Sequence, residues 1–152
     1  MSMTLRKLTI DDCTLALAMN RTFREGFFPS AEAAESFLQD ERNWLFAAID
    51  DGVIVAFAYG YELLRPDSRT MLYIHEFGVA AHRQRQGVGT ALITALKDAC
   101  AARGICRFFL FTAQSNTAAN ALYRKCGGET GWESHGNDTA YHFHTESREV
   151  SP

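Results

Sequence analysis

Two glycines begin an apolar helical pattern near the middle of the 152-residue chain. Gly87 and Gly89 precede apolar residues at helical spacing. The run Gln84-Arg85-Gln86 just before them supplies amide donors and one cation. The first N–H groups of a helix lack intrahelical partners and lie at the positive end of its dipole, and glycine leaves them uncovered. The pattern therefore indicates a site for an anion such as a pyrophosphate.

Two common phosphate-binding motifs are excluded. A Walker A loop requires GxxxxGK[ST], which the chain does not contain. A Rossmann fingerprint requires a third glycine where Leu92 stands and an acid about twenty residues further on, and both are missing. The alternative to a ligand site is a helix that merely begins in a glycine-rich turn.

The elements that must position this site follow from periodicity, caps and turn residues. Strands are expected at residues 4–9, 44–49, 53–64, 70–79, 105–112, 129–134 and 139–145. Helices are expected from a cap at Asp11 or Asp12 to Phe23, after the cap Ser30, at 87–102 and at 116–126. The run at 105–112 is almost wholly apolar, which predicts a buried strand.

Turn residues separate these elements. Asp50-Asp51-Gly52 predicts a hairpin turn, Gly127-Gly128 a helix C-cap, and Gly136-Asn137 a closing turn. With no linker or repeat, the order predicts one α+β domain over residues 1–152 with a mixed central sheet, frayed at 147–152.

Charge is distributed unevenly along the chain, whose net charge is −3. Residues 81–128 hold seven basic side chains and one acidic, whereas the remainder holds eight basic and seventeen acidic. A basic segment around the proposed anion site favours an anionic cofactor, and the acidic remainder favours a cationic second substrate. The alternative is that linear charge counts do not correspond to faces of the fold.

Other features bound the class of protein. The four cysteines lack CxxC spacing, which favours reduced thiols over disulfides or a metal site. No apolar run is long enough to span a membrane, and the N-terminus lacks a signal-peptide core. We therefore expect a cytoplasmic protein with no membrane or nucleic-acid partner.

Two motifs resemble those of the GNAT superfamily of N-acetyltransferases. Gln84-x-x-Gly87-x-Gly89 resembles the family signature Q/RxxGxG/A. The second run resembles NxxAxxLYxxxGF, with Gly128 in place of the usual aromatic residue: Asn116-x-x-Ala119-x-x-Leu122-Tyr123-x-x-Cys126-Gly127-Gly128.

Within the superfamily, the chain most resembles the aminoglycoside 3-N-acetyltransferases. The run 73–79 followed by 82–87 is similar to YIYDLAV…HRRQGIA of those enzymes, although Glu76 replaces their Asp and His75 their Tyr. Residues 46–48 and 55–58 also resemble the two strands upstream of it.

The resemblance implies a single-domain GNAT fold, a mixed central β-sheet flanked by helices, with a bulged and splayed fourth strand at Gly78 and Val79. It implies acetyl coenzyme A as co-substrate, with the pantetheine arm pairing with the open backbone there and the Val79 N–H polarising the thioester carbonyl. Enzymes of this kind are often homodimers. The implied coenzyme A contacts are Phe77, Gly78, Val79, Gln84, Arg85, Gln86, Gly87, Val88, Gly89, Thr90 and Asn116.

Acetyl transfer also requires a proton acceptor and a proton donor. Glu76, where the resemblance places the family's acid, would attract the acceptor ammonium and take its proton, and Tyr123 would protonate the leaving thiolate. His75 is the competing base, but neighbouring strand residues face opposite ways, so only one of the pair faces the site without a bulge. The alternatives are a surface carboxylate, a core aromatic and, for Asn116, a helix cap.

The expected acceptor is a small polycationic amine. Its binding residues are proposed as His75, Glu62, Asp67 and Asp138. We expect no metal site, including at His142 and His144, which lack CxxC or HExxH partners. The leading function is acetylation of the 3-amino group of an aminoglycoside, which confers antibiotic resistance. The alternatives are another amine, such as a polyamine, amino acid or protein N-terminus, and a non-catalytic module that binds coenzyme A.

Overall fold

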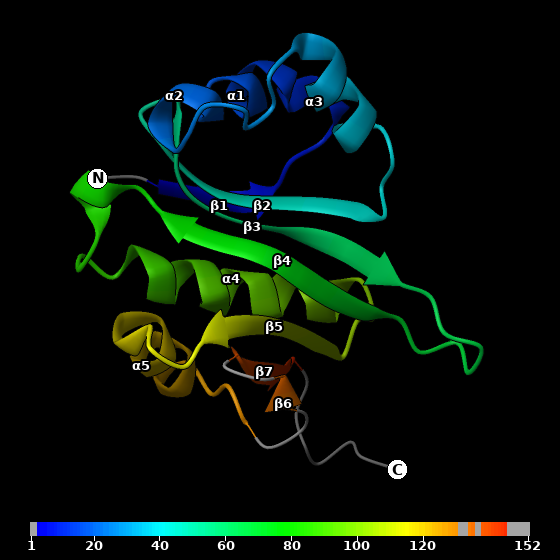
Figure 1. Cartoon of the computed structure of the whole chain (residues 1–152). Coiled ribbons are helices and arrows are strands. Elements are labelled where there is room, and N and C mark those ends of the chain that lie inside the picture. Colours follow the sequence, from blue (N-terminus) through cyan, green and yellow to red (C-terminus); the bar gives the residue numbers. More distant parts are fainter. Residues whose placement is uncertain (1–2, 131–133, 136–137, 146–152) are drawn as a thin grey trace.

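The sheet runs through the whole molecule. The computed structural model describes residues 3–130, 134–135 and 138–145 (Figure 1). Within them the strands form a seven-stranded sheet of order β1-β2-β3-β4-β5-β7-β6. Their bounds are β1 Met3–Lys7, β2 Asn43–Asp50, β3 Val53–Leu63, β4 Met71–Val79, β5 Arg107–Ala113, β6 Ser134–His135 and β7 Asp138–His144. Only β4 and β5 pair in parallel, so the described sheet is mixed, as predicted.

Helices cover both faces of this sheet. Three short N-terminal helices, α1 Cys13–Leu17, α2 Met19–Thr22 and α3 Ala31–Leu38, lie over one face, and α4 Val88–Ala102 and α5 Thr117–Lys125 lie on the other side (Figure 1). Two 3-10 turns, η1 Ile10–Asp12 and η2 Ala81–Arg83, precede α1 and α4. No helix among the described residues is long and apolar enough to cross a membrane.

Each face of the sheet has its own hydrophobic core. The larger core packs α4 and α5 against the sheet around Trp44, Leu92 and Phe108. The smaller packs the N-terminal helices around Met19 and Phe57. The strand at 105–112 was predicted to be buried on both faces, but only alternate residues of β5 are buried. The other face of β5 carries half-buried aromatic rings instead.

The first predicted helix differs in its cap and its continuity. Thr9 is the N-cap: its hydroxyl accepts from the Asp11 N–H at 3.3 Å, and the Asp12 carboxylate accepts from the Thr9 N–H at 2.8 Å. Thr9 thus caps the turn η1. The expected cap at Asp12 is confirmed in position, since Asp12 is the N-cap of α1, but its carboxylate makes no capping hydrogen bond to α1 because it accepts from Thr9 as in a capping box. The helix is also broken at Ala18 into α1 and α2.

The other turn predictions that the structure describes are confirmed. Ser30 accepts from the Ala33 N–H at the start of α3. Asp51 and Gly52 have φ of 52° and 74°, the left-handed pair of a two-residue hairpin turn. Gly127 has φ of 93° at the end of α5. The turn at 136–137 and the tail at 147–152 lie outside the described residues.

The fourth strand is bulged and splayed. Tyr59 pairs with Glu76 while the next residue of β3, Gly60, pairs with Ile74, so β4 contains one extra residue, His75. A Cβ on Gly60 would lie 1.7 Å from the Tyr73 carbonyl oxygen, so this close approach requires glycine. The bulge is therefore at His75, three residues before the expected position at Gly78 and Val79. Pairing of β4 with β5 is confined to Leu72–Phe108 and Tyr73–Phe109, and beyond it the two strands diverge.

Candidate active site

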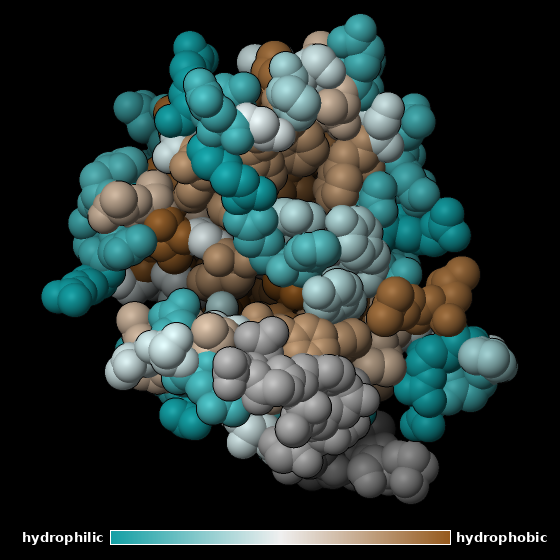
Figure 2. Space-filling view, viewed as in Figure 1, coloured by the Kyte–Doolittle hydropathy of each residue, from teal (hydrophilic) through white to brown (hydrophobic). Residues whose placement is uncertain are grey.

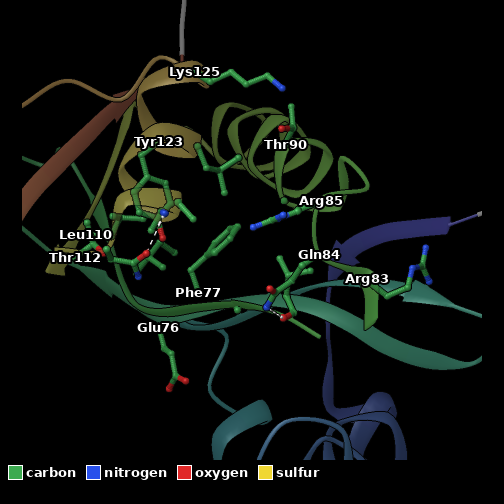
Figure 3. A pocket seen from close by; sticks show the side chains of 18 of the residues that line it. Glu76, Phe77, Arg83, Gln84, Arg85, Thr90, Leu110, Thr112, Tyr123 and Lys125 are labelled. Atoms are coloured by element: carbon green, nitrogen blue, oxygen red, sulfur yellow. Dashed lines mark hydrogen bonds between the residues drawn. The ribbon is translucent and has the colours of Figure 1, made fainter. Parts of the chain in front are cut away.

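A cavity of about 780 Å³ opens where β4 and β5 diverge, and it continues along the first turn of α4 and one side of α5 (Figure 3). Both proposed catalytic residues, Glu76 and Tyr123, line it. So do nine of the predicted coenzyme A contacts: Phe77, Gly78, Val79, Gln84, Arg85, Gly87, Gly89, Thr90 and Asn116. The two motif segments thus meet at one cleft.

The backbone before α4 passes twice through the left-handed region. Arg85 has φ of 64° and Gly87, the N-cap of α4, has φ of 83°. No atom lies within 4 Å of the position that a Cβ on Gly87 would take. Glycine is thus favoured at residue 87 by backbone conformation, and the space in front of it is open. Since no side chain caps α4, its first N–H groups are available at the cavity wall.

Gly89 has a packing role as well. A Cβ there would lie 3.0 Å from Cδ2 of Leu122 and 3.7 Å from Cγ2 of Val79. The absence of a side chain at Gly89 lets α4 and α5 approach each other. The two glycines of the motif therefore meet different physical requirements.

Side chains of the loop before α4 hold its shape. Arg83 donates to Asp50 at 2.8 Å and to Oε1 of Gln86 at 3.1 Å, and the Gln86 amide donates to the His82 carbonyl at 3.0 Å. Gln86 is not among the residues that line the cavity, and Val88 is buried in the core. The side chains of these two residues therefore hold the loop and the start of α4, and their contact with coenzyme A stays a prediction.

The edge of β4 offers a free backbone donor. Ala80 donates to the Val55 carbonyl at 2.9 Å, so the alternation of an antiparallel ladder turns the N–H of Val79 away from β3 and toward the cleft. Gln84 donates its amide to the Val79 carbonyl at 3.1 Å. The Val79 N–H therefore faces the cavity, and its role as the oxyanion donor stays a prediction.

Tyr123 projects from α5 into the cavity. Its ring contacts Phe77 at 5.8 Å, Tyr141 at 5.4 Å and Phe143 at 6.1 Å between centroids. Burial, with a smaller contribution from Tyr141, raises the pKa of Tyr123 to about 12. The phenol is therefore protonated at neutral pH, as a proton donor must be.

Glu76 and His75 lie on the same face of β4, because the bulge places two consecutive residues opposite Tyr59. Figure 3 shows Phe77 and Tyr123 on one side of β4 and Glu76 pointing away on the other. The expectation that only one of the two residues faces the site holds only for a strand without a bulge. Arg24, in the loop after α2, donates to both oxygens of Glu76 at 2.5 and 3.0 Å.

Aromatic rings surround His75, the neighbour of Glu76, on this face. His75 stacks on Tyr59 at 5.5 Å and contacts Tyr61 and Tyr73 at 6.1 and 5.6 Å between centroids. In Figure 2 apolar surface is visible in a hollow below the N-terminal helices. Glu76 is the one acid among the described residues that line the cavity, whereas Arg83, Arg85 and Lys125 bring positive charge to it.

The remaining predicted substrate residues are not part of the described cavity wall. Glu62 accepts from Nε1 of Trp44 at 2.8 Å and from Arg103 at 2.5 Å, and its side chain is 7% exposed. Asp67 pairs with the arginines on either side of it in its own turn, at residues 65 and 69. The side chain of Asp138 lies outside the described residues, although its backbone pairs in β7. Asn116 caps α5 by accepting from the Ala119 N–H at 3.1 Å, and it also lines the cavity.

Arg24 is the site residue that sequence reasoning missed. It lies in the loop between α2 and α3, in a segment outside both motifs, and it reaches Glu76 from 52 residues away in the chain. No local pattern marks it. Tyr59 is the other neighbour of Glu76 that was missed. The alternation of its strand predicts which face of the sheet its side chain is on, but it does not predict that the bulge places it opposite Glu76.

Comparison with known proteins identifies the family. A model described as the acetyltransferase (GNAT) family matches residues 14–128. The chain belongs to this family of acetyltransferases. The matched segment contains the bulge, the turn before α4 and the whole of α5, so the cleft lies in the part of the chain that defines the family.

Individual relatives differ in their acceptors. A ribosomal protein bS18-alanine N-acetyltransferase of Escherichia coli K12 is 33% identical over 119 residues, 78% of this chain and 77% of the relative. The crystal structure of an aminoglycoside acetyltransferase from an uncultured soil metagenomic sample is 29% identical, with a TM-score of 0.71, over 89% of this chain and 95% of that one. The PaiA N-acetyltransferase of Thermoplasma acidophilum, in complex with coenzyme A, has a TM-score of 0.68 at 16% identity, over 95% and 99%.

Proposed function

We propose that this N-acetyltransferase takes its acetyl group from acetyl coenzyme A and transfers it to the terminal α-amine of a polypeptide. The diphosphate of the cofactor binds the N–H groups of the first turn of α4, beside Gly87 and Gly89. The pantetheine arm follows the unpaired edge of β4, and the thioester reaches the gap between β4 and β5. A family neighbour in complex with coenzyme A supports this donor.

The proton acceptor and the proton donor of the proposed reaction lie on opposite sides of β4. A neutral amine nitrogen attacks the thioester carbon, and Glu76 takes the proton that the ammonium form must lose, directly or through water. The N–H of Val79 stabilises the oxyanion of the tetrahedral intermediate. As the carbon–sulfur bond breaks, Tyr123 gives its proton to the thiolate. The acylated nitrogen then loses its extra proton, directly or through water, to the Tyr123 phenolate, and the amide and coenzyme A leave.

The small number of acidic residues at the mouth of the cleft favours an acceptor with a single positive charge. An aminoglycoside brings several ammonium groups, and strong binding of each requires a nearby carboxylate. Glu76 is the one acid among the described lining residues, and Arg24 already pairs with it. A peptide terminus brings a single ammonium, and the rings of Tyr59, Tyr73 and His75 offer an apolar wall for the residues that follow it.

The test is an acetylation assay with the full chain and acetyl coenzyme A. The acceptors are a peptide with an N-terminal alanine, the same peptide with its α-amine blocked, spermidine and gentamicin. We expect mass spectrometry to place one acetyl group on the α-amine of the free peptide and none on the blocked peptide. Turnover confined to gentamicin or spermidine would overturn the peptide acceptor.

An aminoglycoside is the second candidate, and Glu76 favours it, since the carboxylate stands where an ammonium of a cationic substrate would approach the thioester. The 29% identity to an aminoglycoside acetyltransferase supports the same acceptor. The dependence of acceptor binding on salt concentration distinguishes the two candidates. Binding of a polycation weakens steeply as the salt concentration rises, whereas binding of a singly charged terminus changes little.

A further inference from the structure

Three side chains of metal-ligating type converge away from the cleft, on the outer strands of the sheet. One ligand atom of each of Glu129, His142 and His144 lies within 4.8 Å of the other two. Oε1 of Glu129 is 3.9 Å from Nε2 of each histidine. The histidine rings are 5.5 Å apart between centroids. Among the described residues this is the one such cluster, and none of its members lines the catalytic cavity.

The backbone fixes this convergence. His142 and His144 are two residues apart in β7, so both side chains leave the same face of the strand. Glu129 pairs with His142 through two backbone hydrogen bonds, of 3.0 and 3.1 Å, which place the carboxylate directly beside the two rings. The sequence expectation of no metal here considered the two histidines alone, because Glu129 reaches them only through this isolated bridge.

We propose that Glu129, His142 and His144 bind one divalent transition-metal ion, of which Zn²⁺ is the probe of choice. Two imidazoles and one carboxylate are ligands that Zn²⁺ and its neighbours accept. Ligand atoms at about 2.0–2.1 Å from a tetrahedral Zn²⁺ are about 3.4 Å apart. The two separations of 3.9 Å from Glu129 must therefore close slightly, and the ligand atoms of the two histidines, which lie within 4.8 Å of each other, must also come closer. The Glu129 side chain is 43% exposed, so a change of its rotamer can shorten its own two distances, and small changes of the histidine rotamers shorten the third. Water completes the coordination.

Apart from Glu129, the strand register places one charged side chain on the face of the cluster, and it is a cation that works against a divalent ion. Arg107 of β5 lies opposite His144 in the strand register and brings a cation to the same face. Phe109, opposite His142, brings none. The competing occupant is a proton, since protonated imidazoles would pair with Glu129 without any metal. Metal coordination uses a lone pair on each ring, so both imidazoles are neutral in the complex.

The site joins two segments of the chain that frame Tyr123. Glu129 directly follows the C-cap of α5, where Gly128 donates to the Tyr123 carbonyl at 2.8 Å. Next to His142 in β7, Phe143 contacts the Tyr123 ring at 6.1 Å. A metal ion would hold the end of α5 against β7, which makes it a structural clasp behind the proton donor and gives it no part in the chemical step.

The experiment titrates metal into untagged, chelator-treated full-length protein at pH 7.5. We expect calorimetry to show one equivalent of Zn²⁺ per chain and thermal melts to show a rise in Tm on addition of Zn²⁺. Co²⁺ in place of Zn²⁺ should give visible ligand-field bands without the near-ultraviolet charge-transfer bands of thiolate ligands.

Four variants make the test specific. His142→Gln and His144→Gln should abolish stoichiometric binding, and Glu129→Gln should weaken it by at least about tenfold. His82→Ala, which removes an exposed histidine elsewhere, should bind like the wild type. Binding that survives in both histidine variants, thiolate bands with Co²⁺, or a wild type that binds no Zn²⁺ while pairing Glu129 with protonated histidines by NMR would each overturn the site. Because these readouts need no turnover, they are independent of the proposed acceptor.

Discussion

Arg24 donates to both carboxylate oxygens of Glu76, at 2.5 and 3.0 Å, on the face of β4 opposite Phe77 and Tyr123. The ion pair, with its charge-assisted hydrogen bonds, raises the pKa of Arg24 above its usual value. A substrate ammonium that approaches Glu76 therefore competes with a guanidinium for the same two oxygens. In the proposed reaction it also approaches from the side of the strand away from Tyr123, so the amine and the thioester would meet through the gap between β4 and β5.

Replacing Glu76 by Gln should lower kcat by a factor of roughly 10² to 10⁴, because the variant keeps the shape of the residue but cannot take a proton. The affinity for coenzyme A should be unchanged, since Glu76 lies across β4 from the diphosphate loop. Release of the coenzyme A thiol measures kcat, and calorimetry measures the affinity. An unaltered kcat would remove Glu76 from the mechanism.

Replacing Arg24 by Ala should lower KM for the amine, because it removes the competing cation from Glu76. An exposed ion pair of this kind contributes about 0.2–1 kcal/mol, which corresponds to a decrease in KM of about 1.4- to 5-fold. Arg24→Lys, which retains the charge but not the two-pronged contact, is the matched control and should lie between. A rise in KM in the alanine variant would instead show that Arg24 itself contacts the acceptor.

Replacing Tyr123 by Phe should lower kcat by roughly 10² to 10⁴ while the fold is kept. The ring contacts with Phe77, Tyr141 and Phe143 remain in the variant, and only the hydroxyl is lost. Near-ultraviolet circular dichroism reports on the packing and steady-state kinetics on the rate. If both the melting curve and kcat of Tyr123→Phe equal those of the wild type, another group protonates the thiolate.

The raised pKa of Tyr123 also predicts a pH dependence of stability. In the unfolded chain its phenol ionises near pH 10, whereas in the folded protein it ionises at about 12, so the neutral form is favoured by folding. Its contribution is fully present below pH 10 and is lost as the pH rises toward 12, by up to about 3 kcal/mol. Urea denaturation at pH 9 to 11 should show this loss in the wild type and less of it in Tyr123→Phe. If the free energy of unfolding falls equally with pH in the wild type and in Tyr123→Phe, the loss of stability comes from a group other than Tyr123.

Much of the cofactor side of the cleft could be predicted because its determinants are local. Residue 87 is glycine because its φ is positive, and residue 89 is glycine because a neighbouring side chain is too close for a Cβ. Both requirements act within a few residues, so the glycine spacing can be recognised in the sequence. The same holds for the hairpin at Asp51 and for the C-cap at Gly127, where backbone conformation selects the residue type.

The acceptor side could not be predicted, because its determinants are long-range. The bulge at His75 depends on Gly60 of the neighbouring strand, where the close approach of the Tyr73 carbonyl leaves no room for a Cβ. Arg24 reaches Glu76 only after the N-terminal helices pack on the sheet. Linear charge counts suggested an acidic acceptor pocket, but Glu62, one of its proposed members, faces Trp44 and Arg103.

The two glycines of the motif should respond differently to substitution. Gly87→Ala places a Cβ in open space but strains a backbone with φ of 83°, at a cost of about 1 kcal/mol, and should weaken coenzyme A binding by about tenfold. Gly87→Asn is the matched control, because asparagine tolerates the left-handed region, and it should retain most of the affinity. An equal loss of coenzyme A affinity in the two variants would show that Gly87 is required for the absence of a side chain and not for its backbone conformation.

Glu62 should affect stability and leave catalysis unchanged. Its replacement by Ala leaves the Nε1–H of Trp44, a residue 1% exposed, without its acceptor, which costs about 1–3 kcal/mol in the free energy of unfolding. Asp67→Ala removes an exposed turn carboxylate and should change that free energy by less than about 0.5 kcal/mol. Urea denaturation measures both, and KM for the peptide should equal the wild-type value in each. An increase in KM for Glu62→Ala without loss of stability would return this residue to the substrate pocket, because only a contact with the acceptor would then account for its effect.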